Sequence, residues 1–164
     1  MHLPVFHSMA EFSLVAMGGT FDIIHNGHIA LLEKAFTISD DVIIGLTGDE
    51  LALKKGKKIN HNFEQRSFTL KQIIITRFPN KLFTVSQLDN DFGPAVLEGD
   101  VQALVVSDET AYQGDVLNKL RIERGLSPVQ VIVVPMILAK DGIRISSTRI
   151  RSSEIDPQGN LIKS

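Results

Sequence analysis

Two histidines, a hydroxyl and three glycines lie close together in the run GGTFDIIHNGH, at residues 18–28. His25 and His28 are three residues apart, so they occupy neighbouring positions on a helical turn. The apolar run before them has strand character and the residues after them have helical spacing, which places both histidines near a helix start. Free backbone N–H groups at a helix start bind anions, and imidazoles beside them suit a polyphosphate. The run therefore predicts a site for a nucleotide triphosphate.

The glycines and histidines of this run also have ordinary interpretations. Gly18 and Gly19 would let the backbone approach a ligand closely, and Gly27 would leave room for a nucleotide beside the helix start. Alone, a Gly-Gly pair is more typical of a plain strand-to-helix turn, and it lacks the GxGxxG spacing of a nicotinamide site. The histidines could instead be cap residues or metal ligands. Zinc would need a third nitrogen or sulfur ligand, which the neighbouring sequence lacks.

A second polar cluster lies near the carboxyl end, in the run RISSTRIR. Its members are three hydroxyl residues and three arginines: Ser146, Ser147, Thr148, Arg144, Arg149 and Arg151. The hydroxyls can cap a short helix whose first N–H groups point outward, and arginines donate strong hydrogen bonds to phosphate. Alone, this cluster would be more typical of a capped surface helix. Together with the first cluster it predicts two anion sites that hold opposite parts of one triphosphate.

Charged residues follow three further strand-like runs. A basic loop comes after one of them and carries Lys54, Lys55, Lys57 and Lys58. Such a run is usually a solvated face, but at the end of a strand it could close over an anionic substrate. The carboxylates at 89–91 and at 108–109 could bind a polar group, although turn formation explains the first set equally well. Neither set has a spacing that indicates a metal site.

Five apolar runs separated by amphipathic segments must position these clusters. The expected strands are Phe12–Met17, Val42–Leu46, Leu82–Val85, Ala103–Val106 and Val129–Val134, and the expected helices are Gly27–Thr37, Asn62–Arg77 and Thr110–Arg124. Consecutive Val, Ile and Leu are typical of parallel strands covered on both faces. The pattern predicts an α/β fold, a doubly wound Rossmann-like domain with a five-stranded parallel sheet. Ligands of such sheets bind beyond the carboxyl ends of the strands, where the polar clusters lie.

Composition limits the function classes further. The 164 residues are 43% hydrophobic, which suits one domain at 11–164 preceded by a tail at 1–10. The net charge of −2 gives no support for nucleic-acid binding, and no apolar run has membrane-spanning length. With no cysteine, disulfides and thiolate chemistry are excluded. We expect a cytoplasmic protein with no membrane partner.

At these residues the chain resembles a known superfamily. GGTFDIIHNGH resembles the HxGH signature of the nucleotidyltransferases, and ISSTRIR resembles their carboxyl-terminal nucleotide motif. Five further segments extend the resemblance: Lys57 to Arg66, DNDFGPAV at 89–96, ALVVSDET at 103–110, IERGLSP at 122–128 and DGIRISSTRIR at 141–151. The combined set, from Phe12 to Ile155, is similar to the phosphopantetheine adenylyltransferases of the archaeal and eukaryotic type.

That resemblance implies transfer of the adenylyl group of ATP to 4'-phosphopantetheine, which yields dephospho-coenzyme A and pyrophosphate. It implies catalytic roles for His28, Thr20 and Lys57, and acceptor binding by Thr20, Lys57 and Asp108. The ATP-binding residues that it implies are Gly18, Gly19, Phe21, His25, Gly27, Ser146, Ser147, Thr148 and Arg149. Mg²⁺ is expected to arrive with ATP, because the chain shows no metal site of its own. We expect a monomer.

One departure and several alternatives accompany this interpretation. The bacterial form of the enzyme carries an arginine-bearing loop after its fourth strand, whereas this chain has Ser107 to Thr110 (SDET) there. Other small HxGH enzymes, such as a glycerol-phosphate-type cytidylyltransferase or an FAD synthetase, share the first motif and differ in acceptor. A class I aminoacyl-tRNA synthetase would need a KMSKS-like loop and a longer chain. A noncatalytic nucleotide-binding module would bind ATP without releasing pyrophosphate.

Overall fold

A single five-stranded parallel sheet forms the centre of the computed structural model, which describes residues 10–162. The strands are β1 (Phe12–Gly19), β2 (Ser39–Thr47), β3 (Leu82–Leu88), β4 (Ala103–Ser107) and β5 (Gln130–Val134). Their order across the sheet is β3-β2-β1-β4-β5, and every neighbouring pair is parallel. The chain therefore winds outward from β1 in both directions, which confirms the doubly wound α/β prediction. Residues 1–9 of the expected tail lie outside the described residues.

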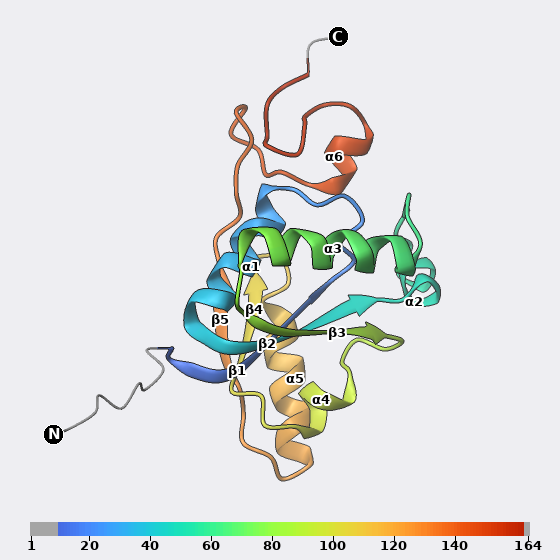
Figure 1. The fold of residues 1–164 in the computed structure, drawn as a ribbon. Coiled ribbons are helices and arrows are strands. Elements are labelled where there is room, and N and C mark those ends of the chain that lie inside the picture. Colours follow the sequence, from blue (N-terminus) through green and yellow to red (C-terminus); the bar gives the residue numbers. More distant parts are fainter. Residues whose placement is uncertain (1–9, 163–164) are drawn as a thin grey trace, which may run out of the picture.

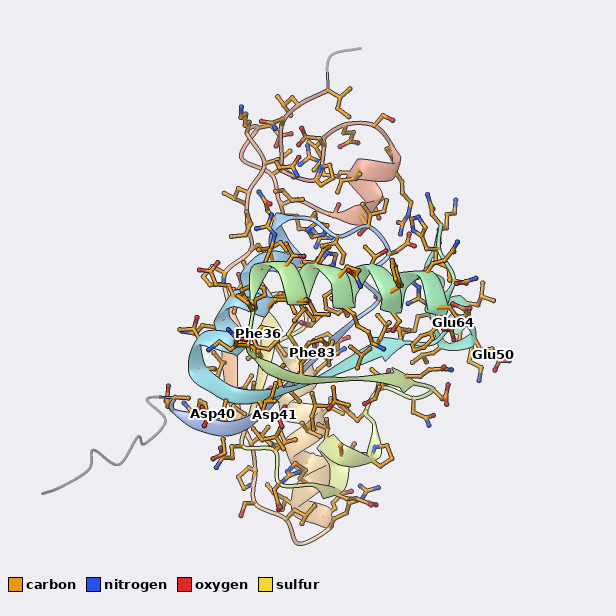
Figure 2. The ribbon with its side chains drawn as sticks, viewed as in Figure 1. Phe36, Asp40, Asp41, Glu50, Glu64 and Phe83 are labelled. Carbon is orange, nitrogen blue, oxygen red and sulfur yellow. The ribbon has the colours of Figure 1, made fainter. Side chains whose placement is uncertain are left out.

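Helices cover both faces of the sheet (Figure 1). They are α1 (Asn26–Ile38), α2 (Asp49–Lys54), α3 (Phe63–Arg77), α4 (Pro94–Glu98), α5 (Tyr112–Glu123) and α6 (Ser147–Arg151). Alternate residues of β1 point to opposite faces. Val15 and Met17 join the core cluster that contains α1 and α3, whereas Ala16 joins the cluster that contains α5. Figure 2 shows Phe36 of α1 beside Phe83 of β3. Their rings meet edge to face, with their centroids 6.4 Å apart.

The structure moves some expected boundaries and adds two short helices. β1 continues through the glycine pair, because Gly18 is in register with Gly45 and Gly19 with Leu46. The strand therefore runs two residues past its expected end at Met17, and the alternative that the pair is a plain strand-to-helix turn is wrong. Helices α2 and α4 were not expected, since six and five residues are too few for helical periodicity to show. Gly125, at φ 74°, follows α5 as the expected helix stop.

The last part of the chain, from residue 135 onward, folds over the end of the sheet near the start of α1. It has a small core of its own, formed by Ala139, Ile145 and Ile155. The N–H group of Asn26 donates to the carbonyl of Pro157 at 3.0 Å, which ties α1 to this segment. In Figure 1 the segment carries α6 at the carboxyl-terminal end of the molecule, beyond α1 and α3. No helix among residues 10–162 is long and apolar enough to cross a membrane.

Candidate active site

A cavity of about 730 Å³ lies beyond the ends of β1, β4 and β5. This volume is typical of a small-molecule site. Eight of the residues expected from the sequence line it: Thr20, Phe21, His25, Gly27, Lys57, Ser146, Ser147 and Thr148. The three polar clusters, which are far apart in the sequence, thus meet at one place.

His25 and His28 cap the start of α1 with their imidazoles. Nδ1 of His25 accepts a hydrogen bond from the N–H of Gly27 at 3.0 Å, and Nδ1 of His28 accepts from the N–H of His25 at 3.2 Å. Since a backbone N–H can only donate, both rings carry their proton on Nε2. The two Nε2–H groups are the donors that remain for a ligand.

Both imidazoles are neutral at pH 7. Burial, together with the charge of Arg144, lowers the pKa of His25 to about 4. Burial lowers the pKa of His28 further, to about 3, and His25 and Lys57 add to the effect. The histidines therefore offer hydrogen-bond donors and no positive charge. His25 lines the cavity, and His28 stacks against His25.

Gly19 and Phe21 form the wall behind His28. The side chain of Phe21 is buried, its φ is 50°, and its ring lies 4.9 Å from that of His28 between centroids. A Cβ on Gly19 would lie 3.0 Å from the Phe21 ring. A side chain at position 19 would therefore crowd this aromatic ring, which is a different reason for a glycine than the plain turn offered as an alternative.

Lys57 and Thr20 lie together on another wall of the cavity. The Nζ of Lys57 donates to the hydroxyl of Thr20 at 3.2 Å, and the N–H of Lys57 donates to the carbonyl of Ala52 at 3.0 Å. Partial burial and the neighbouring charge of Lys55 lower the pKa of Lys57. The basic loop therefore contributes one placed ammonium group next to the first motif.

Ser146 begins α6 as the sequence predicts. It is the N-cap, and its hydroxyl accepts from the N–H of Arg149 at 3.2 Å. The hydroxyl of Ser147 donates to the carbonyl of Ile23 at 3.4 Å, which links α6 to the loop after β1. Serine and threonine hydroxyls and helix-start N–H groups on this wall are suited to phosphate oxygens.

The structure separates the arginines of the second cluster. Arg149 does not line the cavity: its guanidinium pairs with Asp141, and its Nε donates to Glu154 at 2.8 Å. Arg144 and Arg151 do line the cavity. Arg144 pairs there with Glu109 of the loop after β4. Arg149 was expected to contact ATP, but the structure places its side chain outside the cavity.

Asp22 belongs to the first motif, but the sequence interpretation gave it no role in the site. Only 1% of its side chain is exposed, and its carboxylate accepts from Arg151 Nη2 at 2.8 Å. Burial alone would raise the pKa of Asp22, but the bonds from Arg151, Asn60 and His61 outweigh it and lower the pKa. The only signal in the sequence was the place of Asp22 inside the first motif, between Thr20 and His25.

Besides Arg149, four expected residues do not line this cavity: His28, Gly18, Gly19 and Asp108. Asp108 accepts from the N–H of Met136 at 3.3 Å, and its neighbours Ser107 and Glu109 line the cavity in its place. Gly18 lines a second cavity of about 120 Å³, together with Leu88, Phe92 and other residues of β2, β3 and α4. Among residues 10–162 no group of three or more His, Cys, Asp or Glu could hold a metal ion.

Comparisons with known proteins show the family to which the chain belongs. The family model of cytidylyltransferase-like proteins matches residues 16–153. Phosphopantetheine adenylyltransferase of Methanothermobacter thermautotrophicus is 42% identical over 154 residues, which cover 93% of this chain and 92% of that protein. The protein of the same name from Pyrococcus horikoshii is 40% identical over 158 residues, which cover 94% of this chain and 98% of that protein.

Solved structures show the same architecture. A protein of unknown function from Archaeoglobus fulgidus superposes with a TM-score of 0.67 at 28% identity, over 74% of this chain and 88% of that one. Tyrosyl-tRNA synthetase from the same organism reaches a TM-score of 0.61 at 14% identity, over 86% of this chain and 60% of that one. At that identity the second likeness concerns the fold alone.

Proposed function

The chain belongs to the phosphopantetheine adenylyltransferase family of cytidylyltransferase-like proteins, and from this premise we propose how its residues carry out the reaction. As a member it is a nucleotidyltransferase that transfers the adenylyl group of ATP to 4'-phosphopantetheine. The products are dephospho-coenzyme A, an intermediate of coenzyme A biosynthesis, and pyrophosphate. The roles of the individual residues are the proposal.

The transfer proceeds in one displacement. An oxygen of the acceptor phosphate attacks the α-phosphorus of ATP, the bond from that phosphorus to the bridging oxygen breaks, and pyrophosphate leaves with the electron pair. No side chain forms a covalent bond to the nucleotide. The protein's contribution is to align the reactants and to stabilise the negative charge that develops around the α-phosphorus.

The observation that carries this proposal is the placement of Lys57 and Thr20 across one cavity from Ser146 and its helix. Lys57 and Thr20 hold the attacking phosphate, and His28 donates from Nε2 to the α-phosphate. Ser146, Ser147 and Thr148 bind the β- and γ-phosphates, which become pyrophosphate. Arg151 takes the phosphate contact that the sequence assigned to Arg149, because it is Arg151 that lines the cavity.

Magnesium enters this scheme as part of the substrate. The described residues offer no acidic cluster for a resident ion, so the ligands of Mg²⁺ are phosphate oxygens of ATP and water. The positive charges of Lys57 and Arg151 supplement the charge of the ion. Carboxylates near the phosphates are already paired with arginines, as Asp22 is with Arg151.

The second cavity suits the uncharged arm of the acceptor. It is lined by Gly18, and the first cavity is lined by Thr20, two residues further along the same strand end. Apolar side chains of Leu88 and Phe92 lie beside the amide of Gln113 in its wall. An amide-containing chain with a terminal thiol would match such a lining, with its phosphate at Lys57.

We propose that the active form is a monomer. We place the enzyme in the cytoplasm, where ATP is available. ATP and 4'-phosphopantetheine are the partners that the family implies, with no nucleic acid among them.

A product assay tests the proposed function. The purified protein is incubated with MgATP and 4'-phosphopantetheine. Formation of dephospho-coenzyme A is followed by mass spectrometry, and release of pyrophosphate by a coupled assay. His28→Ala, prepared in parallel, controls for contaminating activity. CTP with glycerol phosphate, and ATP with FMN, test the other HxGH activities. Lack of dephospho-coenzyme A, or a faster reaction with one of the other pairs, would contradict the proposal.

A further inference from the structure

Asp22 uses both of its carboxylate oxygens to hold segments that are remote in the sequence. Oδ1 accepts from the N–H of His61 at 2.9 Å, and the N–H of Asn60 lies 2.9 Å from Oδ2. Nδ1 of His61 lies 3.1 Å from Oδ1, and Nη2 of Arg151 donates to Oδ2 at 2.8 Å. At 1% exposure the carboxylate is shielded from water, so these bonds have little competition from solvent.

Arg151 depends on this carboxylate for its position. Its Nε is buried and has no hydrogen-bond partner among the described residues, and the bond from Nη2 to Asp22 is the contact that fixes the guanidinium. Arg151 is the last residue of α6 and lines the wall that we assign to the departing phosphates. A phosphate group that binds Arg151 would therefore contact the same guanidinium that Asp22 holds in place.

Asn60 and His61 belong to the segment that carries Lys57. This segment connects α2 to α3, and Arg66 holds its far end: Nε of Arg66 donates to the carbonyl of His61 at 3.0 Å. Nη1 of the same guanidinium donates to the carbonyl of Thr20 at 2.9 Å. The loop after β1 and the lysine-bearing segment are therefore bonded to each other at three places, through Asp22, through Arg66 and through the bond from Lys57 to Thr20.

We propose that Asp22 is a positioning residue that couples nucleotide binding at Arg151 to acceptor binding at Lys57. A nucleotide that fixes the Arg151 guanidinium also fixes the Asp22 carboxylate, and this orders the segment 57–61 before the acceptor arrives. The second ligand then has less conformational entropy to lose. Because such coupling is reciprocal, the acceptor strengthens nucleotide binding by the same factor. This inference rests on the proposed function, since it takes the two ligands from it.

Calorimetric titration measures the coupling. The dissociation constant of 4'-phosphopantetheine is determined without and with saturating Mg²⁺ and α,β-methylene-ATP, which cannot transfer its adenylyl group. We expect the nucleotide to tighten acceptor binding about fivefold or more in the unmodified protein. In Asp22→Asn this ratio should fall close to one, because the amide places a donor where Arg151 and two backbone N–H groups already donate.

Asp156→Asn is the matched control. Asp156 also accepts from two backbone N–H groups, those of Gln158 and Asn160, but it does not line the cavity. This variant should keep the ratio of the unmodified protein. The inference would be overturned if Asp22→Asn had the same ratio of dissociation constants as the unmodified protein. A merely structural role of Asp22 would weaken the binding of each ligand without changing how much one ligand strengthens the binding of the other.

Hydrogen exchange tests the coupling without any substitution and without the acceptor. The amides of Asn60 and His61 donate to Asp22 and do not line the cavity. Binding of Mg²⁺ and α,β-methylene-ATP to the unmodified protein should slow their exchange about fivefold or more. Unchanged exchange in the nucleotide-bound protein would overturn the inference, even if Asp22→Asn fails to fold. The product assay alone decides the proposed function, so the two failures are distinguishable.

Discussion

The imidazole rings of His25 and His28 stack with their centroids 3.9 Å apart. This arrangement follows from their shared role as helix caps, in which each Nδ1 accepts from a backbone N–H group at the start of α1. Two rings that cap the same turn lie face to face, and a positive charge on one ring would repel a positive charge on the other. The stack therefore holds two neutral donors, and the HxGH spacing is what permits it.

Replacing His28 by alanine should lower kcat about 10²–10³-fold, the usual effect of removing one donor from a developing negative charge. The KM for ATP should change little, because other hydroxyls and arginines bind the phosphates of the ground state. Steady-state kinetics with both substrates varied will measure this. His28→Gln, which can place an amide N–H near the position of Nε2, should recover part of kcat. A His28→Ala enzyme with unchanged turnover would remove His28 from the mechanism.

The pKa values of the two histidines predict that neither ring shapes the pH profile of the reaction. Since burial holds the pKa of His25 near 4 and that of His28 near 3, neither ring titrates between pH 6 and 8. A plot of kcat/KM against pH should therefore show no ascending limb from these rings, and the limb at about pH 6 that the acceptor phosphate itself produces should be the same in His28→Gln. A limb that is lost in His28→Gln would show that His28 works as a titrating acid or base.

The same pKa values predict how stability depends on pH. In the unfolded chain both histidines take up protons near pH 6.5, whereas in the native protein they do so only near 4 and 3. The unfolded state therefore binds more protons over this window, and the free energy of unfolding should decrease as the pH falls from about 6.5 to 4. Asp22, whose pKa is lowered, should weaken the fold only below its unfolded value of about 3.9. Urea denaturation at several pH values, with His28→Gln for comparison, will separate the two windows.

Local sequence patterns were sufficient for the sheet and the first motif. The Val, Ile and Leu runs predicted all five strands, because strands covered on both faces must be apolar throughout. Gly27 and the histidines fall at the start of α1 as the periodicity indicates. These features depend on neighbours in the sequence, so one sequence can reveal them.

Features that depend on distant partners were not predictable in this way. Arg149 and Arg151 are chemically alike and two residues apart, and only the fold directs one to Asp141 and Glu154 and the other to the cavity. The reason for a glycine at position 19 is the Phe21 ring that lies against it, which no local pattern reveals. Asp22 has the partners Asn60, His61 and Arg151, which no local pattern connects to it.

Lys57→Gln should lower kcat/KM for the acceptor about 10–100-fold, the range expected when a hydrogen bond to a charged group is lost. The ammonium of Lys57 lies 3.2 Å from the Thr20 hydroxyl, whereas Lys54 lies in the same basic run but outside the cavity. Lys54→Gln therefore serves as the control and should behave as the unmodified enzyme. Equal losses in both variants would mean that the loop acts through its general charge alone.

Arg66→Met should destabilise the fold by about 3–5 kcal/mol, as is usual when one partner of a buried charged network is removed. The Arg66 side chain is fully buried and donates to the carbonyls of Thr20, Thr47 and His61, which would lose these bonds. Arg77→Met, at the exposed end of the same helix, should change stability by less than about 0.5 kcal/mol. Chemical denaturation gives both values. A small loss in Arg66→Met would mean that water or a neighbour replaces the guanidinium.

Gly27→Ala should impair nucleotide binding with little effect on stability. A Cβ at this position would lie 2.8 Å from Cε1 and 3.0 Å from Nδ1 of His25, so the imidazole must move and lose its bond to the N–H of residue 27. The lost cap costs about 1 kcal/mol, and alanine returns about the same in helix propensity. The displaced ring also leaves the stack with His28.

Asn26→Ala, in the same turn, adds no atom beside the ring and is the control. We expect a KM for MgATP raised about tenfold in Gly27→Ala and unchanged in Asn26→Ala, with melting temperatures within a few degrees of the parent. An unchanged KM in Gly27→Ala would show that His25 does not need this position to bind the phosphates.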